Sequence, residues 1–253
     1  TATHTPRTRE LISREKLLEL YTAMMKCRML AGRAGTLKAE PRWEATYAAV
    51  ALDLKARDAV AAASGLPLIR AVRGAALARS LAALAKPRRA ATTNPLVDAC
   101  DSARALKAAK STHIAVAFFA DRQVKPAQAR KALSLAARRG LPVIFVSLRI
   151  AGAAPAFAPP GTDTPEALAF GVPLITVDGA DVAAVYRVAS ESFSRARQSR
   201  IPTLIDCVLD PAADPVAQVE AWLAARGLFT PQLRRRVRSA ITREMNAATP
   251  RHG

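Results

Sequence analysis

The sequence predicts an α/β protein built on a parallel sheet with helices on both faces. From residue 113 onward, apolar runs of strand length alternate with segments of helical periodicity. The apolar runs are continuous, which is typical of strands that are buried on both faces. Alanine-rich segments of helical character lie at both ends of the chain, so we expect helices there as well.

The composition supports a packed protein. The chain has 253 residues, of which 51% are hydrophobic and only 5% aromatic, so we expect a core built mainly from alanine and leucine. This apolar content excludes disorder over most of the length. The three cysteines, Cys27, Cys100 and Cys207, are far apart and form no CxxC pair. A disulfide framework and a zinc ribbon are therefore excluded.

Helices dominate the region before residue 113. Ser13 can cap a long first helix whose apolar stripe runs from Leu17 to Leu30. Further helical patterns cover residues 43–54, 68–85 and 95–110. The segment from Lys86 to Pro95 interrupts these patterns with prolines and basic residues, so we expect a loop there.

The remainder alternates strand and helix. We expect strands at residues 113–119, 142–147, 174–177 and 203–208, and helices at 126–138 and 178–198, with an irregular crossover over 148–173. Asp214-Pro215 and Thr230-Pro231 begin two closing helices, which end near Gly227 and Ala247. We therefore expect one domain over residues 11–247, with extended or disordered tails at 1–10 and 248–253.

Several classes of protein are disfavoured. No apolar run approaches the roughly 18 residues of a membrane span, and Thr1 to Glu10 lack the apolar core of a signal peptide. We therefore expect a soluble protein of the cytoplasm. Of the three histidines, His4 and His252 lie near the ends, which leaves His113. A catalytic triad or a site with several histidine ligands is accordingly unexpected.

One long motif resembles a known family. It runs from Gly171-Val-Pro-Leu-Ile-Thr-Val-Asp-Gly to Tyr186 and continues through Pro202-Thr-Leu-Ile-Asp206. This string resembles the alpha subunit of the thiamine diphosphate-dependent, decarboxylating component of 2-oxo acid dehydrogenase complexes. Similar matches occur at residues 17–28, 43–45, 115–122, 141–146 and 214–230, so the resemblance covers about residues 10–247. It implies a thiamine diphosphate-binding type of fold.

The cofactor motif departs from the family pattern. Family members hold magnesium and thiamine diphosphate with Gly-Asp-Gly after one strand and Asn-Asn after the next. Here the first triplet is Ala120-Asp121-Arg122 and the pair is Arg149-Ile150. Arginine has no acceptor atom and isoleucine has no polar group, so neither can ligate magnesium. Asp121 is thus a vestigial ligand, and we expect no catalytic residues, no bound metal and no cofactor.

Other family features are missing too. The Tyr-Arg pair that contacts the cofactor falls on Ser64-Gly65, although a later Arg-Gly is kept as Arg73-Gly74. Two histidine-containing segments correspond to the loops at residues 86–95 and 209–215, which hold none. Glu44 occupies the place of a functional glutamate, but a charge at a helix start explains it equally well. Asp178 and Asp181 are most simply helix caps, and Trp43 and Trp222 core residues.

The charge predicts acidic partners. The 38 Lys and Arg against 20 Asp and Glu give a net charge of +18, with a dense cluster at Arg234-Arg-Arg236 and Arg238. Such a field favours an acidic protein, a nucleic acid or an anionic membrane surface. Because no aromatic residues are interleaved, a stacking platform for single strands is unexpected, and binding to a nucleic acid backbone stays a minor alternative.

The first hypothesis is a catalytically silent, alpha-like subunit of a 2-oxo acid dehydrogenase-type assembly, bound to a beta-type subunit or another component. The second is an active alpha subunit, with thiamine diphosphate and magnesium, completed by a beta subunit. The third is a basic nucleic-acid-binding protein on a recycled fold. The resemblance implies a cytoplasmic location, or the mitochondrial matrix in a eukaryote.

The vacated site can close in two ways. Asp121 and Arg149 follow neighbouring strands, whose carboxyl ends share one edge of a parallel sheet. We expect Arg149, or failing it Arg122, to pair with Asp121 in place of the metal. The alternative is that Arg122 and Arg149 together bind a phosphate group.

Overall fold

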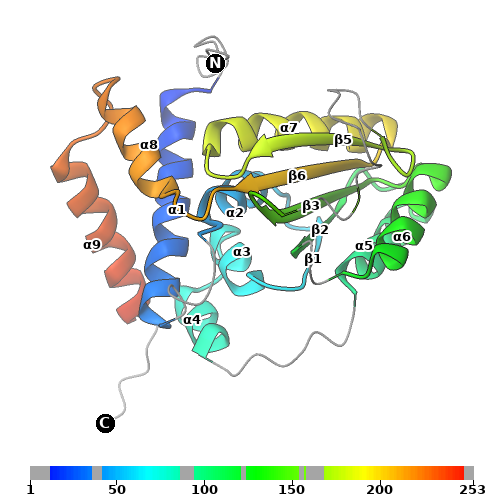
Figure 1. The fold of residues 1–253 in the computed structure, drawn as a ribbon. Coiled ribbons are helices and arrows are strands. Elements are labelled where there is room, and N and C mark those ends of the chain that lie inside the picture. Colours follow the sequence, from blue (N-terminus) through cyan, green and yellow to red (C-terminus); the bar gives the residue numbers. More distant parts are fainter. Residues whose placement is uncertain are drawn as a thin grey trace, which may run out of the picture.

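The computed structural model describes residues 12–35, 42–85, 94–120, 124–153, 157 and 168–247 (Figure 1). Its helices are α1 (Arg14–Arg33), α2 (Glu44–Ala51), α3 (Leu66–Val72), α4 (Leu77–Ala85), α5 (Pro95–Ala108), α6 (Pro126–Arg139), α7 (Val182–Ser199), α8 (Pro215–Ala224) and α9 (Pro231–Ala247). Its strands are β1 (Ala59–Ala62), β2 (Ala115–Ala120), β3 (Val143–Ile150), β4 (Leu168–Ala169), β5 (Val172–Asp178) and β6 (Thr203–Leu209).

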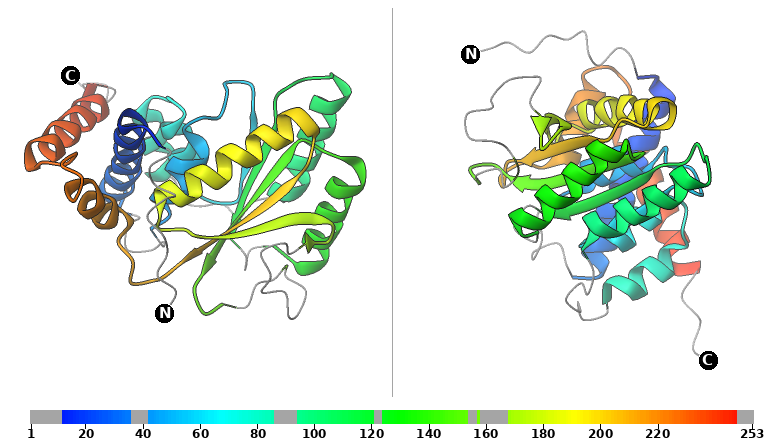
Figure 2. Two further views of the ribbon diagram at one scale, coloured as in Figure 1. Left: turned by 90° about the horizontal axis from the view of Figure 1, so that it is seen from above. Right: turned by 90° about the vertical axis from the view of Figure 1, so that its right-hand side faces the viewer.

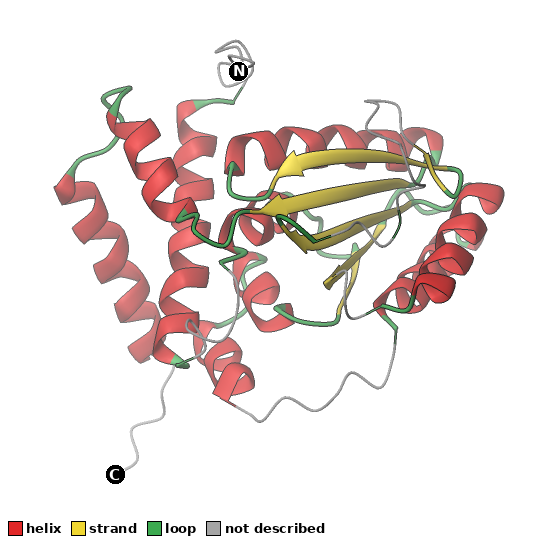
Figure 3. Ribbon diagram, viewed as in Figure 1, coloured by secondary structure: helices red, strands yellow, loops and turns green. Residues whose placement is uncertain are grey.

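The strands form one sheet in the order β1-β2-β3-β6-β5-β4 (Figure 3). The pairs β1–β2, β2–β3, β3–β6 and β5–β6 are parallel, and only the short β4 runs antiparallel to β5. The expected α/β class with a parallel sheet is therefore confirmed. The carboxyl ends of β2, β3, β6 and β5 consequently meet at one edge.

Both faces of the sheet are covered by helices, as expected. Ile144 and Val146 belong to a core shared with α1, α2 and α7, whereas Val143 and Phe145 belong to a second core shared with α5 and α6 (Figure 2). This placement explains the continuous apolar runs, because both sets of alternating side chains are buried. Helices α8 and α9 gather with α1 at one end of the molecule, and α6 lies at the other (Figures 1 and 2).

The first helix follows its sequence signals. The Ser13 side chain accepts a hydrogen bond from the Lys16 backbone amide and caps α1. Its apolar stripe is buried, with Leu20, Tyr21 and Met24 fully enclosed. Helix α1 packs against α2, α3, α8 and α9, so it connects the sheet domain to the closing helices.

The secondary structure differs from the prediction in three places. The crossover over residues 148–173 was expected to be irregular, but its described part includes the end of β3, the strand β4 and the start of β5. The helix expected over residues 68–85 is broken into α3 and α4, because Gly74 adopts a φ of +90° and the chain turns after Arg73. The short edge strand β1 was not expected, because its sequence Ala-Val-Ala-Ala has low strand propensity. It forms because Ala59 to Ala62 pair in register with Ala115 to Phe118 of β2.

Some expectations fall outside the described residues. The tails at 1–10 and 248–253, most of the 86–95 loop and much of the 148–173 crossover lie there, so the division into one domain and two tails stays a prediction. Within the described ranges, no helix is long and apolar enough to cross a membrane.

Candidate functional site at the carboxyl edge of the sheet

Arg149 is held in place near the end of β3. Its Nε and Nη2 donate to Oδ2 of Asp206 at 3.0 and 2.6 Å, and its Nη1 donates to the Ala153 carbonyl oxygen at 3.1 Å. The side chain of Arg149 is only 14% exposed and that of Asp206 only 8%. Each nitrogen of the guanidinium therefore already has a protein acceptor, and the pair ties β3 to β6.

Within the described residues, the acidic partner of Arg149 is Asp206. Asp121 and Arg122 lie outside the described residues, so their pairing with each other or with Arg149 stays a prediction. Ala120, which directly precedes Asp121, pairs with Leu148 in the β2–β3 register. Asp206 was part of the family string but was not singled out. Its signal is an acidic residue inside a buried apolar strand, which needs a cationic partner.

Residues 149 and 150 do not fit a magnesium diphosphate group. Arg149 carries a positive charge and no acceptor, and Ile150 is apolar and packs against the core beside α1 and α7. Magnesium needs oxygen ligands. In the described ranges, no three His, Cys, Asp or Glu side chains are grouped so that they could hold a metal ion.

The pocket beside this edge is also unsuited to a diphosphate. It has a volume of about 360 Å³ and lies between the start of α7 and helix α8, lined by Asp178, Asp181, Gln218 and Trp222 among others. Asp181 caps the start of α7, as the sequence predicted, whereas Asp178 accepts the Ala180 amide in the turn before the helix and is not its cap. Two carboxylates in the wall repel an anion.

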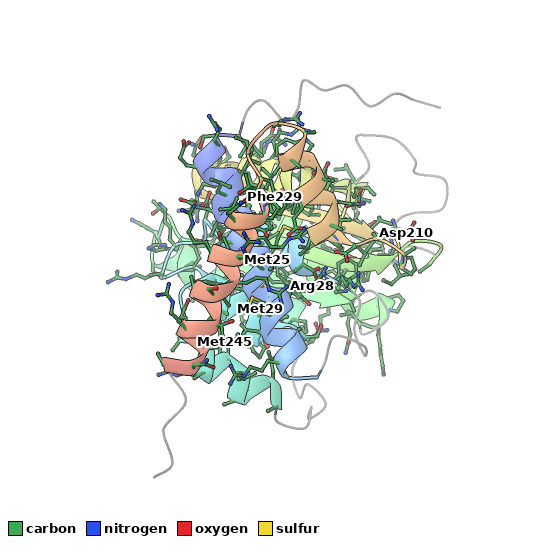
Figure 4. The ribbon with its side chains drawn as sticks, turned by 90° about the vertical axis from the view of Figure 1, so that its left-hand side faces the viewer. Met25, Arg28, Met29, Asp210, Phe229 and Met245 are labelled. Carbon is green, nitrogen blue, oxygen red and sulfur yellow. The ribbon has the colours of Figure 1, made fainter. Side chains whose placement is uncertain are left out.

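Glu44 is committed to an ion-pair network. It is buried at the start of α2, where its Oε1 accepts hydrogen bonds from Nε and Nη2 of Arg28, a residue of α1 labelled in Figure 4. Arg28 also reaches Asp214 at the start of α8, and Arg42 pairs with the same carboxylate at 2.7 Å. These contacts join α1, α2 and α8, so the structure gives Glu44 a structural partner.

The network shifts two pKa values. Burial acts to lower the pKa of Arg28, but hydrogen bonds and charges from Asp214 and Glu44 outweigh it and raise that pKa. Partial burial acts to raise the pKa of Asp214, yet Arg28 and the Ala217 amide hold it below its ordinary value. Both groups are therefore charged at neutral pH, and neither can exchange a proton there.

His113 lies at the opposite edge of the sheet. It precedes β2, where its Nδ1 is 3.3 Å from Oδ1 of the buried Asp58. Asp58 also accepts the backbone amides of Lys55 and Ile114 and pairs with Arg197 of α7. The imidazole thus belongs to a cluster that fastens the amino ends of β1 and β2. It is remote from Arg149.

The cysteines supply no reactive thiol. All three are buried and free. Burial raises the pKa of Cys100 and of Cys207 to about 12, and that of Cys27 further still. A thiol with so high a pKa carries almost no thiolate at neutral pH.

The tryptophans differ from each other. Trp43 is buried, as expected, and its ring lies against Gly179. Trp222 is only partly buried, because it lines the pocket. The guanidinium carbon of Arg226 lies 4.2 Å from the centroid of its ring. The expectation of a core residue is therefore correct for Trp43 and only partly correct for Trp222.

Comparison with known proteins identifies relatives. Over 114 residues, the chain is 36% identical to the alpha subunit of acetoin:2,6-dichlorophenolindophenol oxidoreductase of Bacillus subtilis. This match covers 44% of this chain and 34% of the relative. It is 39% identical over 98 residues to the chloroplastic pyruvate dehydrogenase E1 component subunit alpha-3 of Arabidopsis thaliana, covering 37% and 23%. The matches thus span about a third or less of these two relatives.

A solved structure and a family model also match the chain, and the family model shows the family. An X-ray structure assigned as a thiamin diphosphate-dependent enzyme from Mycobacterium smegmatis is similar to this chain, with a TM-score of 0.45 and 19% identity. The match covers 66% of this chain and 31% of the Mycobacterium smegmatis chain. The model of the dehydrogenase E1 component family matches residues 80–209, about half of the chain. These residues include β2, β3, β5 and β6 together with Arg149 and Asp206. The chain therefore belongs to the dehydrogenase E1 component family.

Proposed function

We propose that the chain is a catalytically silent, alpha-like subunit of a 2-oxo acid dehydrogenase-type assembly, with a structural or regulatory role. The observation that carries this proposal is the Arg149–Asp206 pair. A cation stands where the family has a metal-ligating asparagine, and an internal carboxylate neutralises it. Fold alone does not transfer an activity once the residues of the site have changed.

The alternative closure, in which Arg149 binds a phosphate, has less support. Three of the five N–H donors of Arg149 serve Asp206 and the Ala153 carbonyl, so a phosphate that engaged the whole guanidinium would displace those contacts. Losing those contacts would leave the Asp206 carboxylate nearly buried without its cation, which is costly. Arg149 therefore acts as a cross-link between β3 and β6.

Glu44 supports the same proposal. The side chain of Glu44 is buried, and its Oε1 already accepts hydrogen bonds from Nε and Nη2 of Arg28. Its observed role is to hold α1 to α2.

The second candidate is an active alpha subunit that a beta subunit completes. The curated relatives favour it, since they are named as subunits of oxidoreductases. In that case Asp121 would be the remaining metal ligand, and the partner would supply most of the chemistry.

An exchange within the assembly separates the two candidates. Tagged wild-type chain and the variant Asp121→Ala are each expressed in the source cell and recovered with their partners at low salt. Magnesium-dependent thiamine diphosphate affinity and 2-oxo acid turnover are then measured for both assemblies, with Asp210→Ala as a control for an exposed carboxylate on the loop after β6. If the subunit is silent, the assemblies with wild-type chain, Asp121→Ala and Asp210→Ala should show equal cofactor affinity and equal turnover. If it is active, only the assembly with Asp121→Ala should lose them.

The net charge bears on the partner. The net charge of +18 opposes the approach of a second copy of the chain and attracts an acidic surface. We therefore propose a beta-type chain or another component of the assembly as the partner, through a surface that is acidic where it meets this chain.

A further inference from the structure

Helix α9 has two opposite faces. Its apolar face carries Val237, Ile241 and Met245, spaced four residues apart, and Ile241 and Met245 are buried. This face packs on α1 and α4, and Figure 4 labels Met25, Met29 and Met245 where α1 and α9 lie together. Such spacing places the three side chains on one stripe of the helix.

The edges of that contact are also satisfied. Arg234 pairs with Glu220 of α8, whose Oε1 accepts a hydrogen bond of 2.8 Å from the Tyr21 hydroxyl of α1. Glu244 pairs with Lys26 of α1 at 3.3 Å. Because the carboxylates next to α9 are used in this way, they do not neutralise its other face. Helix α9 is thus fixed on α1.

The outer face is uniformly basic. Arg235, Arg236, Arg238 and Arg243 are exposed, and none forms an ion pair with a residue in the described ranges. At 100° per residue Arg235, Arg236 and Arg243 fall on the side of α9 away from Ile241, whereas Arg238 lies at the edge of that side, about 60° from Ile241. Two exposed hydroxyls, Ser239 and Thr242, lie between them.

The make-up of this face identifies the chemistry of its occupant. Protein interfaces depend on apolar or aromatic anchors in a central, dehydrated patch. The outer face of α9 has no apolar side chain larger than alanine and no aromatic one. Arginine and hydroxyl side chains are instead the groups that contact phosphate oxygens of nucleic acids, an interaction that needs no apolar anchor.

We propose that the outer face of α9 binds the phosphate backbone of duplex DNA. The absence of aromatic residues on α9 disfavours stacking with single-stranded bases. Helix α9 is about 25 Å long and lies at one end of the molecule, so its exposed side can enter the wide major groove of B-form DNA, whereas the deep major groove of duplex RNA is too narrow. This activity is independent of the function proposed above.

The test uses two variants of equal charge. In the first, Arg235, Arg236, Arg238 and Arg243 are replaced by Gln. In the matched control, Arg130, Lys131, Arg138 and Arg139 of α6 are replaced by Gln, which removes the same four charges from exposed positions at the other end of the molecule. Affinity for a 20-base-pair DNA is measured by fluorescence anisotropy from 50 to 200 mM salt, beside a duplex RNA of the same sequence and polyglutamate.

We expect wild-type affinity for DNA to fall by at least about a hundredfold over this salt range, because four phosphate contacts give a log–log slope of about −3.6. In the α9 variant the log–log slope should become shallower by about 3.6, whereas the α6 variant should keep the wild-type slope. Circular dichroism and the midpoint of urea unfolding check that both variants remain folded. Equal losses in the two variants, no wild-type binding at 50 mM salt, or affinity for RNA or polyglutamate as high as for DNA would each overturn the proposal.

Discussion

Two nitrogens of Arg149 converge on a single oxygen of Asp206, at 3.0 and 2.6 Å, across the junction between β3 and β6. Asp206 pairs with Ser147 in the strand register, so the arginine reaches it diagonally from two residues further along β3. This contact fastens the sheet at the edge where the E1 family binds its cofactor. The arginine and the aspartate thus form an ion pair inside the protein at this edge.

Removing the carboxylate from this pair should destabilise the fold. Asp206→Asn leaves a largely buried guanidinium without its anion, which typically costs about 3–5 kcal/mol. Urea unfolding of the variant measures this cost. The double variant Arg149→Met, Asp206→Leu removes both charges and should recover at least half of the loss. A cost below about 0.5 kcal/mol for Asp206→Asn would show that the pair contributes little.

The Arg28–Asp214 contact should make stability depend on acid pH. The pKa of Asp214 in the fold lies below its ordinary value of 3.8. Its contribution is therefore complete above that value and is lost as the pH falls through the lower, folded pKa. Asp214→Asn keeps a side chain that can cap α8 but removes the charge.

The free energy of unfolding of wild type and Asp214→Asn is compared between pH 2 and pH 7. The difference should be greatest near neutrality and should shrink below about pH 4. A difference that stays constant over the whole range would mean that the charge of Asp214 does not contribute.

Gly65 should tolerate substitution less well than Gly74. Both have positive φ, +71° and +90°, so alanine is strained at either position. A Cβ at Gly65 would also lie 2.3 Å from the hydroxyl oxygen of the buried Tyr47, whereas a Cβ at Gly74 meets nothing within 4 Å. Tyr47 cannot easily yield, because its ring packs edge-on against Phe118.

We expect Gly74→Ala to cost about 1 kcal/mol and Gly65→Ala about 3 kcal/mol or more. The free energies of unfolding in urea of the two variants give this comparison directly. Equal costs would contradict the packing described for Tyr47.

The chain should be recovered in a hetero-oligomer. A positive field together with family membership favours association with other, more acidic subunits. Native mass spectrometry of the tagged chain, purified from its source cell at physiological salt, measures the stoichiometry. A monomer without any partner would contradict the assembly proposal.

The sequence predicted the sheet well because its signals are local. Buried strands such as β2 and β3 are continuous apolar runs, and Ser13, Asp181 and Asp214 cap helices where capping residues were identified. β1 has no such signal, since its alanines become a strand only through pairing with β2. The break at Gly74 is likewise weak in sequence, because a single glycine inside a helical pattern is often tolerated.

The candidate site was harder to predict. The sequence shows that Arg149 and Ile150 cannot ligate magnesium, but the choice of Asp206 as the partner of Arg149 depends on strand order. β6 lies beside β3, although 52 residues separate Ile150 from Thr203 in the chain. The Glu44–Arg28 pair similarly depends on how α1 and α2 pack. Contacts between distant segments are fixed by the tertiary fold and carry no local pattern.

A calorimetric titration with magnesium and thiamine diphosphate tests the central claim most directly. It is performed on the purified chain and, in parallel, on the chain recovered with its partners, with Asp121→Ala as the comparison in both. The proposal predicts no heat of binding for the isolated chain and no effect of Asp121→Ala on the recovered assembly. A low-micromolar dissociation constant for the isolated chain, abolished by Asp121→Ala, would contradict the proposal that the cofactor site is lost.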